Sequence, residues 1–175
     1  MMIWPKRFNL YLIFFLMAGL CVGCADKGAK RKVQLTKMDI HIEAPREASN
    51  LSEPVPIYRE KPVMVNVEKE PFLSEVFVDS ARVIDMPGGF GIQLQFNQKG
   101  TWLLEQYSTQ NHGKRLAIHA EFGPELKENR WLAAPKLTKG ISDGLLTFTP
   151  DATREEADDI VLGLNNVSRE VKKRL

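Results

Sequence analysis

The chain has 175 residues and only two cysteines, and its 24 lysines and arginines nearly balance its 22 acidic residues. Two of the basic residues, Lys6 and Arg7, precede a long apolar run, so the rest of the chain has as many basic as acidic residues. A nucleic-acid partner requires a net basic face, and this charge balance argues against one.

The N-terminal segment has the layout of a bacterial lipoprotein signal peptide. Lys6 and Arg7 are followed by the uncharged apolar run Leu10–Val22, and Gly23 then precedes Cys24. About a dozen apolar residues are too few to span roughly 30 Å of hydrocarbon as a permanent helix, so cleavage is favoured. We expect removal of residues 1–23, a lipid such as palmitate on Cys24, and a mature protein anchored to a membrane on its periplasmic, extracytoplasmic side.

An alternative remains open for this segment. The leucine usually found three positions before the modified cysteine is replaced by Cys21, with Leu20 one place further out. An uncleaved N-terminal anchor over 8–24 would leave the rest of the chain outside the membrane as well. Cys21 and Cys24 also match a C-x-x-C pattern, but they lie within the export signal, and we expect neither a disulfide nor a metal site from them.

Residues 24–71 have the composition of a lipid-anchored, partly extended tether. The stretch is charged and contains half of the ten prolines: Pro45, Pro54, Pro56, Pro62 and Pro71. A basic cluster directly behind the lipid site, Lys27, Lys30, Arg31 and Lys32, suits either solvent or anionic headgroups. Two alternating stretches, 38–42 and 63–67, leave open that part of the tether forms edge strands packed on the domain.

Residues 72–175 predict one compact domain of roughly a hundred residues. Alternating apolar positions predict strands, and the turn Pro87-Gly88-Gly89 joins the first two as a hairpin. A helix ends before Gly113, a residue suited to a left-handed cap. The predicted strands are 77–84, 92–97, 116–122, 131–137 and 145–149, and this helix covers 101–112.

The last predicted element begins at a capping box, Thr153–Glu156, and continues as an amphipathic helix. Basic residues in its final turns suit the negative end of a helix dipole. The order strand, strand, helix, three strands, helix predicts an α+β two-layer sandwich with a ferredoxin-like character, in which two helices cover one face of a mainly antiparallel sheet.

Four short motifs in this region resemble the head of the first periplasmic domain of SecD, a protein-export membrane protein. They are IQLQFNQKG at 92–100, GKRLAI at 113–118, WLAAP at 131–135 and TPDATREEA at 149–157. The likeness in order and spacing extends over 92–164. It implies a SecD head-like fold and a non-catalytic domain that contacts other polypeptides. No apolar run after Cys24 is long enough to span a bilayer, so the chain lacks the membrane helices of SecD itself.

An enzymatic site has weak support in the sequence. His119 and Glu121 point to one side of their predicted strand, and His112 lies just before it, which permits a metal or acid–base cluster. An exposed strand face often carries such polar residues without any chemistry. We therefore expect no catalysis, no metal, no cofactor and no small-molecule substrate.

The sheet face opposite the helices is the predicted partner surface, through Gln93, Gln95, His119 and Glu121. The sequence is compatible with two functions. The first is a lipid-anchored envelope module that binds extended polypeptide as an accessory to protein export. The second is a docking or structural lipoprotein that holds one envelope protein and has no role in export.

Overall fold

The computed structural model describes residues 34–45 and 50–174. They lie in one compact unit, Val33–Leu175. The predicted signal peptide, Gly23 and Cys24 lie outside the described residues. No helix in the described part of the chain is both long and apolar enough to cross a bilayer.

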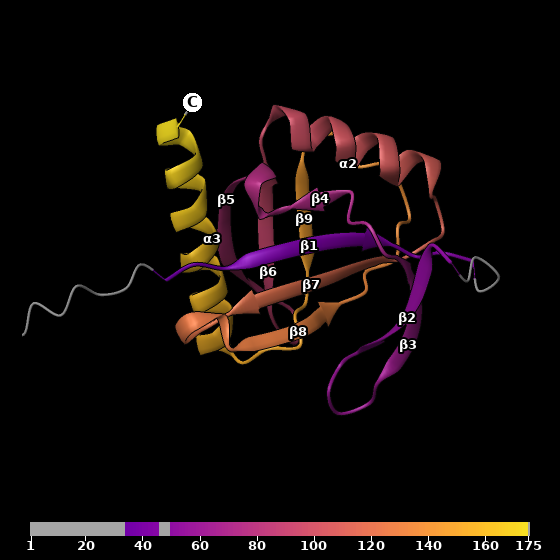
Figure 1. Cartoon of the computed structure of the whole chain (residues 1–175), viewed down its shortest axis with the longest axis horizontal. Coiled ribbons are helices and arrows are strands. Elements are labelled where there is room, and N and C mark those ends of the chain that lie inside the picture. Colours follow the sequence, from indigo (N-terminus) through magenta and orange to yellow (C-terminus); the bar gives the residue numbers. More distant parts are fainter. Residues whose placement is uncertain (1–33, 46–49, 175) are drawn as a thin grey trace, which may run out of the picture. The chain divides into compact units, whose positions relative to one another are not determined.

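Two antiparallel sheets and two long helices build this unit, as Figure 1 shows. The larger sheet has the order β4-β1-β7-β8, formed by Leu73–Ser74, Lys37–Ile42, Leu116–Phe122 and Glu128–Ala133. The smaller has the order β5-β6-β9, formed by Val78–Met86, Gly89–Phe96 and Leu145–Phe148. A separate hairpin pairs β2 (Ser52–Ile57) with β3 (Val63–Glu68). The predicted α+β class with mainly antiparallel pairing is confirmed, although the strands are divided among three sheets.

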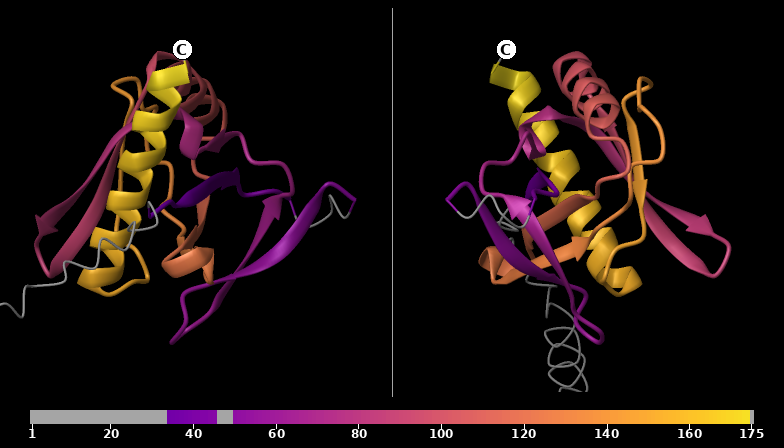
Figure 2. Two further views of the ribbon diagram at one scale, coloured as in Figure 1. Left: turned by 60° about the vertical axis from the view of Figure 1, so that its left-hand side comes forward. Right: turned by 90° about the vertical axis from the view of Figure 1, so that its right-hand side faces the viewer.

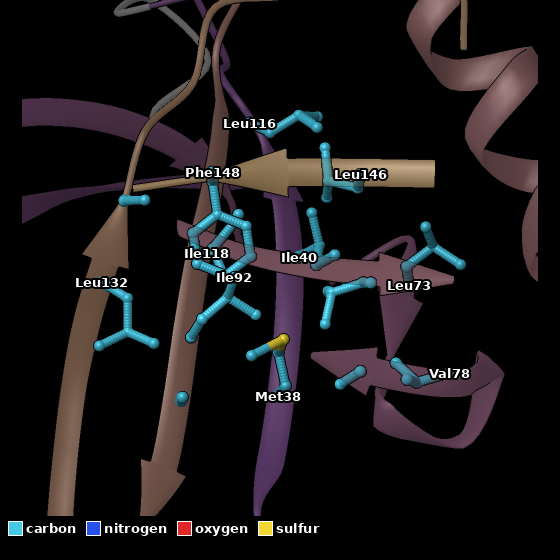
Figure 3. Close-up of a cluster of buried hydrophobic side chains, with 14 of the residues drawn as sticks. Met38, Ile40, Leu73, Val78, Ile92, Leu116, Ile118, Leu132, Leu146 and Phe148 are labelled. Carbon is cyan, nitrogen blue, oxygen red and sulfur yellow. The ribbon is translucent and has the colours of Figure 1, made fainter. Parts of the chain in front are cut away.

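The two sheets share one apolar core, drawn in Figure 3. Ile40 of β1 and Ile118 of β7 meet Ile92 of β6 and Phe148 of β9, and each is at most 3% exposed. Alternation explains the arrangement, because every second residue of a strand points to the same face. Complete burial of such a side chain contributes about 1.5–3 kcal/mol.

The C-terminal helix α3 (Arg154–Arg174) begins at the predicted capping box. The Glu156 backbone N–H donates to Thr153 Oγ1 at 3.2 Å, and the Thr153 N–H donates to Glu156 Oε2 at 2.8 Å. These two bonds satisfy backbone donors that the first helical turn leaves unpaired. The apolar face of the helix, Ala157, Ile160 and Leu164, is completely buried in the core.

Helix α3 also covers the outer edge of β5. The side-chain amide of Asn165 donates to Ala81 O and accepts from Ala81 N–H, both at 2.9 Å, as a neighbouring strand would. Ser168 Oγ donates to Asp79 O at 2.7 Å. An uncovered edge is a template for pairing with another chain, and here the helix occupies it.

Helix α2 spans Gln98–Gln110, which is close to the predicted 101–112. It begins earlier because Asn97 is its N-cap: Asn97 Oδ1 accepts from the Gly100 N–H at 2.9 Å. Gly113 follows the helix with φ +87°, the left-handed conformation expected of it. Tyr107 of α2 stacks on Phe72, with ring centroids 4.4 Å apart.

The structure differs from the predicted boundary at residue 72. Strand β1, within the predicted tether, lies between β4 and β7 and buries Met38, Ile40 and Ile42. The second alternating stretch forms β3, which pairs with β2, and the apolar side of this hairpin packs on β7. Prolines suggested a tether, but alternating apolar side chains provide enough buried surface to order the segment.

The first described residues bind the middle of α3. Asn166 Nδ2 donates to Gln34 O at 2.9 Å, and Gln34 Nε2 donates to Asp159 O at 3.3 Å. A Cβ on Gly163 would lie only 2.8 Å from the Leu35 carbonyl carbon, so this crossing requires glycine in the helix. The compact unit therefore starts close to residue 34.

Candidate polypeptide-binding surface

The four residues predicted to form one partner surface lie on two different sheets. Gln93 and Gln95 belong to β6, whereas His119 and Glu121 belong to β7. The two sheets share no strand pairing and face each other across the core. The polar sides of β6 and β7 therefore belong to two separate outer surfaces.

The outer surface of β5-β6-β9 carries a row of polar side chains across all three strands. Arg82 lies opposite Gln93, and Gln93 lies opposite Thr147. Arg82 Nε donates to Gln93 Oε1 at 2.8 Å, and its Nη2 donates to the same oxygen. Gln93 Nε2 donates to Thr147 Oγ1 at 3.1 Å. The row is held in one arrangement, and the exposed guanidinium keeps donors for a further group.

Gln95 closes one end of this surface. Its Nε2 donates to Phe96 O at 3.2 Å and to Gly144 O at 3.3 Å. Gly144 has φ +69°, and a Cβ there would lie 2.2 Å from Thr101 Oγ1, so glycine is needed at this turn. The turn brings the loop before β9 against β6.

A shallow hollow of about 350 Å³ lies on this surface. It is lined by Ser80, Ala81, Arg82, Gln93, Gln95 and Leu145. Arg82 is the only charged residue among these six. The hollow therefore offers one cation, amide and hydroxyl groups and some apolar surface, which suits a polar or anionic group of an extended polypeptide.

The outer surface of the larger sheet is arranged differently. His119 Nε2 and Asn129 Oδ1 are hydrogen-bonded at 2.7 Å, and the His119 ring lies 5.0 Å from Trp131. Lys37 Nζ pairs with Glu121 Oε2 at 3.1 Å. These polar groups have partners within the sheet, and no set of three or more histidines, cysteines or carboxylates in residues 34–45 and 50–174 is placed to hold a metal ion.

The hairpin β2–β3 covers the part of that surface around Ala117. Its buried side, Val55, Ile57, Val65 and Val67, packs on Ala117 and the partly buried Trp131. The opposite side carries Pro54, Pro56 and Met64, all exposed. The sequence left open a strand at 63–67 packed on the domain; what it did not predict is the partner strand β2, in which Pro54 and Pro56 interrupt the alternation of Val55 and Ile57.

Hydrogen bonds and ion pairs join the tip of the hairpin and strand β8 to the residues around the start of α3. The Arg59 N–H donates to Asp151 Oδ2 at 2.8 Å, and Arg59 Nε donates to the same oxygen at 3.2 Å. Arg130 Nη2 pairs with Glu156 Oε1 at 2.6 Å. Burial alone would raise the pKa of Glu156, but the Thr153 N–H, Arg130 and Arg59 together outweigh it and lower that pKa.

No known protein family and no curated protein matches this sequence. Solved structures of SecDF do match the fold. One, described as a membrane component SecDF that enhances protein export, has 17% identity and a TM-score of 0.54 and covers 95% of this chain and 71% of its own. Another, SecDF in a super-membrane-facing form, has 20% identity and a TM-score of 0.54; the match covers 77% of this chain and 19% of the SecDF chain. The chain thus shares a fold with part of SecDF, as the motif resemblance implied.

Proposed function

We propose that this chain is a lipid-anchored, extracytoplasmic and non-catalytic module that binds extended polypeptide as an accessory to protein export. The observation that carries the proposal is the fold shared with SecDF, a membrane component that enhances protein export. The N-terminal pattern of Lys6, Arg7, an apolar run and Gly23-Cys24 supports export and lipid attachment at Cys24. The lipid takes the place of the membrane helices of SecD as the means of attachment.

The binding site that we propose is the hollow on the β5-β6-β9 surface. A polypeptide bound there contacts the side chains that line the hollow rather than the backbone edge of β5 or of β2. The edge of β5 is occupied by Asn165 and Ser168. Strand β2 has prolines at 54 and 56, which lack the N–H needed for pairing. Arg82 recognises a carboxylate or carbonyl oxygen of the bound segment, and Leu145 provides apolar contact.

Site-specific photocrosslinking in intact cells tests this proposal. A photoreactive amino acid replaces Ser80 at the rim of the hollow, Met64 on the hairpin, or Lys139 as an exposed control. We expect crosslinks from position 80 to many secreted polypeptides or to a translocon subunit, reduced at least about fivefold by Arg82→Ala. Crosslinks no stronger than at position 139 would refute the site, and unimpaired secretion in a deletion strain would refute the role in export.

One observation favours the second function, a docking lipoprotein with one envelope partner. Four of the nine exposed large apolar side chains of the described residues, Leu51, Tyr58, Val63 and Met64, lie on or beside the hairpin. Exposed apolar patches of this kind mark protein interaction sites. A single stoichiometric crosslinked partner at position 64, with none at position 80, would favour docking over polypeptide binding.

A further inference from the structure

Strand β9 forms one edge of the smaller sheet. The order β5-β6-β9 places β6 on one side of β9 and, among the described residues, no strand on the other. The right-hand view of Figure 2 looks onto this side of the molecule, with β9 beside the β5–β6 hairpin. Such an edge presents a row of backbone N–H and C=O groups with which another extended chain can pair.

The outward groups of this edge belong to every second residue. The Phe96 N–H donates to Gly144 O at 2.9 Å, in register with the β6–β9 ladder. Along an antiparallel strand, residues alternate between bonding to the strand opposite and directing their N–H and C=O to the other side. Counting from this bond, Leu146 bonds to β6. The N–H and C=O of Thr147 and the C=O of Leu145 therefore point away from β6.

These outward groups are unpaired. Within residues 34–45 and 50–174, no group bonds to the outward N–H or C=O of Thr147 or to the C=O of Leu145. The Leu145 N–H does have an acceptor, Asp143 Oδ1 at 3.0 Å. The edges of other strands are met by the chain itself: α3 occupies that of β5, and the Asp151 N–H donates to Leu132 O of β8 at 2.7 Å. Strand β9 thus keeps one donor and two acceptors for a further strand.

We propose that an extended segment of a bound polypeptide pairs with β9 and adds a fourth strand to this sheet. The inference rests on the proposed function, the binding of extended polypeptide, and deepens it by naming the contact as backbone pairing at β9. Because every polypeptide carries the same backbone groups, this contact gives affinity without requiring one sequence. It therefore suits a surface that meets many different polypeptides.

The β9 edge is continuous with the hollow. The side chains of Leu145 and Thr147 lie opposite Gln95 and Gln93 on the outer surface, and Leu145 lines the hollow. Every second side chain of the added strand lies on this same surface. Arg82 is about 14 Å from the added strand, at three strand spacings of about 4.8 Å, which four or five further residues of extended chain span. One polypeptide can therefore reach both contacts.

The length of the edge favours a single extended segment over a second copy of this chain. Strand β9 has only 4 residues and is about 13 Å long, at about 3.3 Å per residue. Stable protein–protein interfaces bury about 1,200–2,000 Å², far more than one short strand pair provides. Pairing at β9 therefore suits weak, reversible binding of an unfolded chain, which needs no larger matching surface.

A proline at position 147 tests the backbone contact. Thr147→Pro removes the outward N–H and leaves the β6–β9 ladder intact, because proline is tolerated where the N–H of an edge strand faces solvent. Thr147→Val is the matched control: both variants lose the hydroxyl that accepts from Gln93 Nε2, but valine keeps the N–H. The full chain with a photoreactive amino acid in place of the exposed Thr149, just after β9, is expressed in intact cells with each substitution.

We expect at least about fivefold fewer polypeptide adducts from position 149 in Thr147→Pro than in Thr147→Val, since a backbone hydrogen bond is lost. Circular dichroism checks that both variants fold. Equal adducts in the two folded variants would overturn the pairing, and adducts that persist at position 80 would show that the proposed function stands without it. Adducts at neither position would refute both. A crosslinked dimer of this chain, lost only in Thr147→Pro, would assign the edge to a second copy and overturn the proposal.

Amide exchange of the unsubstituted full chain, followed by NMR in detergent, decides the question if Thr147→Pro does not fold. The probe is reduced and carboxymethylated α-lactalbumin, an unfolded polypeptide. We expect the Thr147 amide to exchange with water at least about tenfold more slowly when the probe is bound, with no change at Lys139. An unchanged rate at Thr147 in the presence of bound probe would overturn the pairing, and failure of the probe to bind would count against the proposed function.

Discussion

The outer surfaces of the two sheets have the same polar alternation but different surroundings. On the larger sheet, the β2–β3 hairpin covers Ala117 and part of Trp131, and His119 and Glu121 are bonded to neighbours within the sheet. On the smaller sheet, Gln93 and Gln95 line an open hollow beside Arg82. Polar alternation along a strand therefore identifies the side away from the core, but it does not tell whether that side is free to bind.

The largest expected effect comes from the covered surface. Ile57→Ala removes a completely buried side chain between the hairpin and β7. We expect a loss of about 2–5 kcal/mol in the free energy of unfolding, because the deletion leaves a cavity. Met64→Ala, on the exposed side of the same hairpin, is the control, with a change within about 0.5 kcal/mol. Denaturant unfolding measures both, and equal small effects would mean that the hairpin is not packed on the sheet.

The tip of the hairpin gives a smaller effect. Asp151→Ala removes the acceptor of two hydrogen bonds, from the Arg59 N–H and from Arg59 Nε. We expect a loss of about 1–3 kcal/mol in unfolding free energy, since a backbone donor is left without its partner. Arg59→Ala keeps the backbone bond, and its side chain is 52% exposed, so its cost is expected below about 1 kcal/mol. A larger loss for Arg59→Ala would contradict this ranking.

The ion pairs of Glu156 with Arg59 and Arg130 depend on pH, because the pKa of Glu156 is lowered in the folded state. The folded state lowers that pKa below its ordinary value of 4.5, so the ionised carboxylate stabilises the fold above that value. The contribution is lost as the pH falls below 4.5 through the folded pKa. We expect Glu156→Gln to cost about 1 kcal/mol at pH 7 and progressively less toward pH 3. Urea unfolding of both proteins at pH 7 and pH 3 measures this cost. A larger loss of unfolding free energy at pH 3 than at pH 7 would contradict the lowered pKa of Glu156.

The open surface is expected to contribute least to stability. Gln93→Ala removes one partner from the row that Arg82 and Thr147 complete, in which Arg82 is exposed and the other two side chains are half-buried. We expect less than about 1 kcal/mol of lost unfolding free energy. Crosslinking of polypeptides from position 80 is expected to fall, because Arg82 loses the amide that orients it. If Gln93→Ala is stable and crosslinking from position 80 is unchanged, the polar row is not required for polypeptide binding.

The sequence predicted best where its signals were local. The capping box at Thr153 and Glu156 forms with both hydrogen bonds, and the strand predicted at 116–122 matches β7. The strand predicted at 131–137 instead spans Glu128–Ala133. It ends before Pro135, which cannot donate to a ladder, and it begins earlier because pairing with β7 continues to Glu128 opposite Phe122. The signal peptide at residues 1–23 and the lipid on Cys24 remain predictions.

The candidate site was predicted only in part. Gln93 and Gln95 line the hollow, but Arg82 and Ser80, which come from the strand before them, were not singled out. His119 and Glu121 belong to the other sheet because β7 pairs with β1, a strand that the proline content assigned to a tether. No local pattern distinguishes a polar position on one sheet from a polar position on another.

By itself, the sequence determined the kinds of elements from residue 77 onward, the start of the last helix and the side of each strand that faces the core. These depend on residues within a few positions of one another. The tertiary structure decided that β1 lies inside the larger sheet, that a proline-containing hairpin covers one outer surface, and that the other stays open. Such choices depend on contacts between distant positions, such as Lys37 with Glu121, and on which packing buries the most apolar surface.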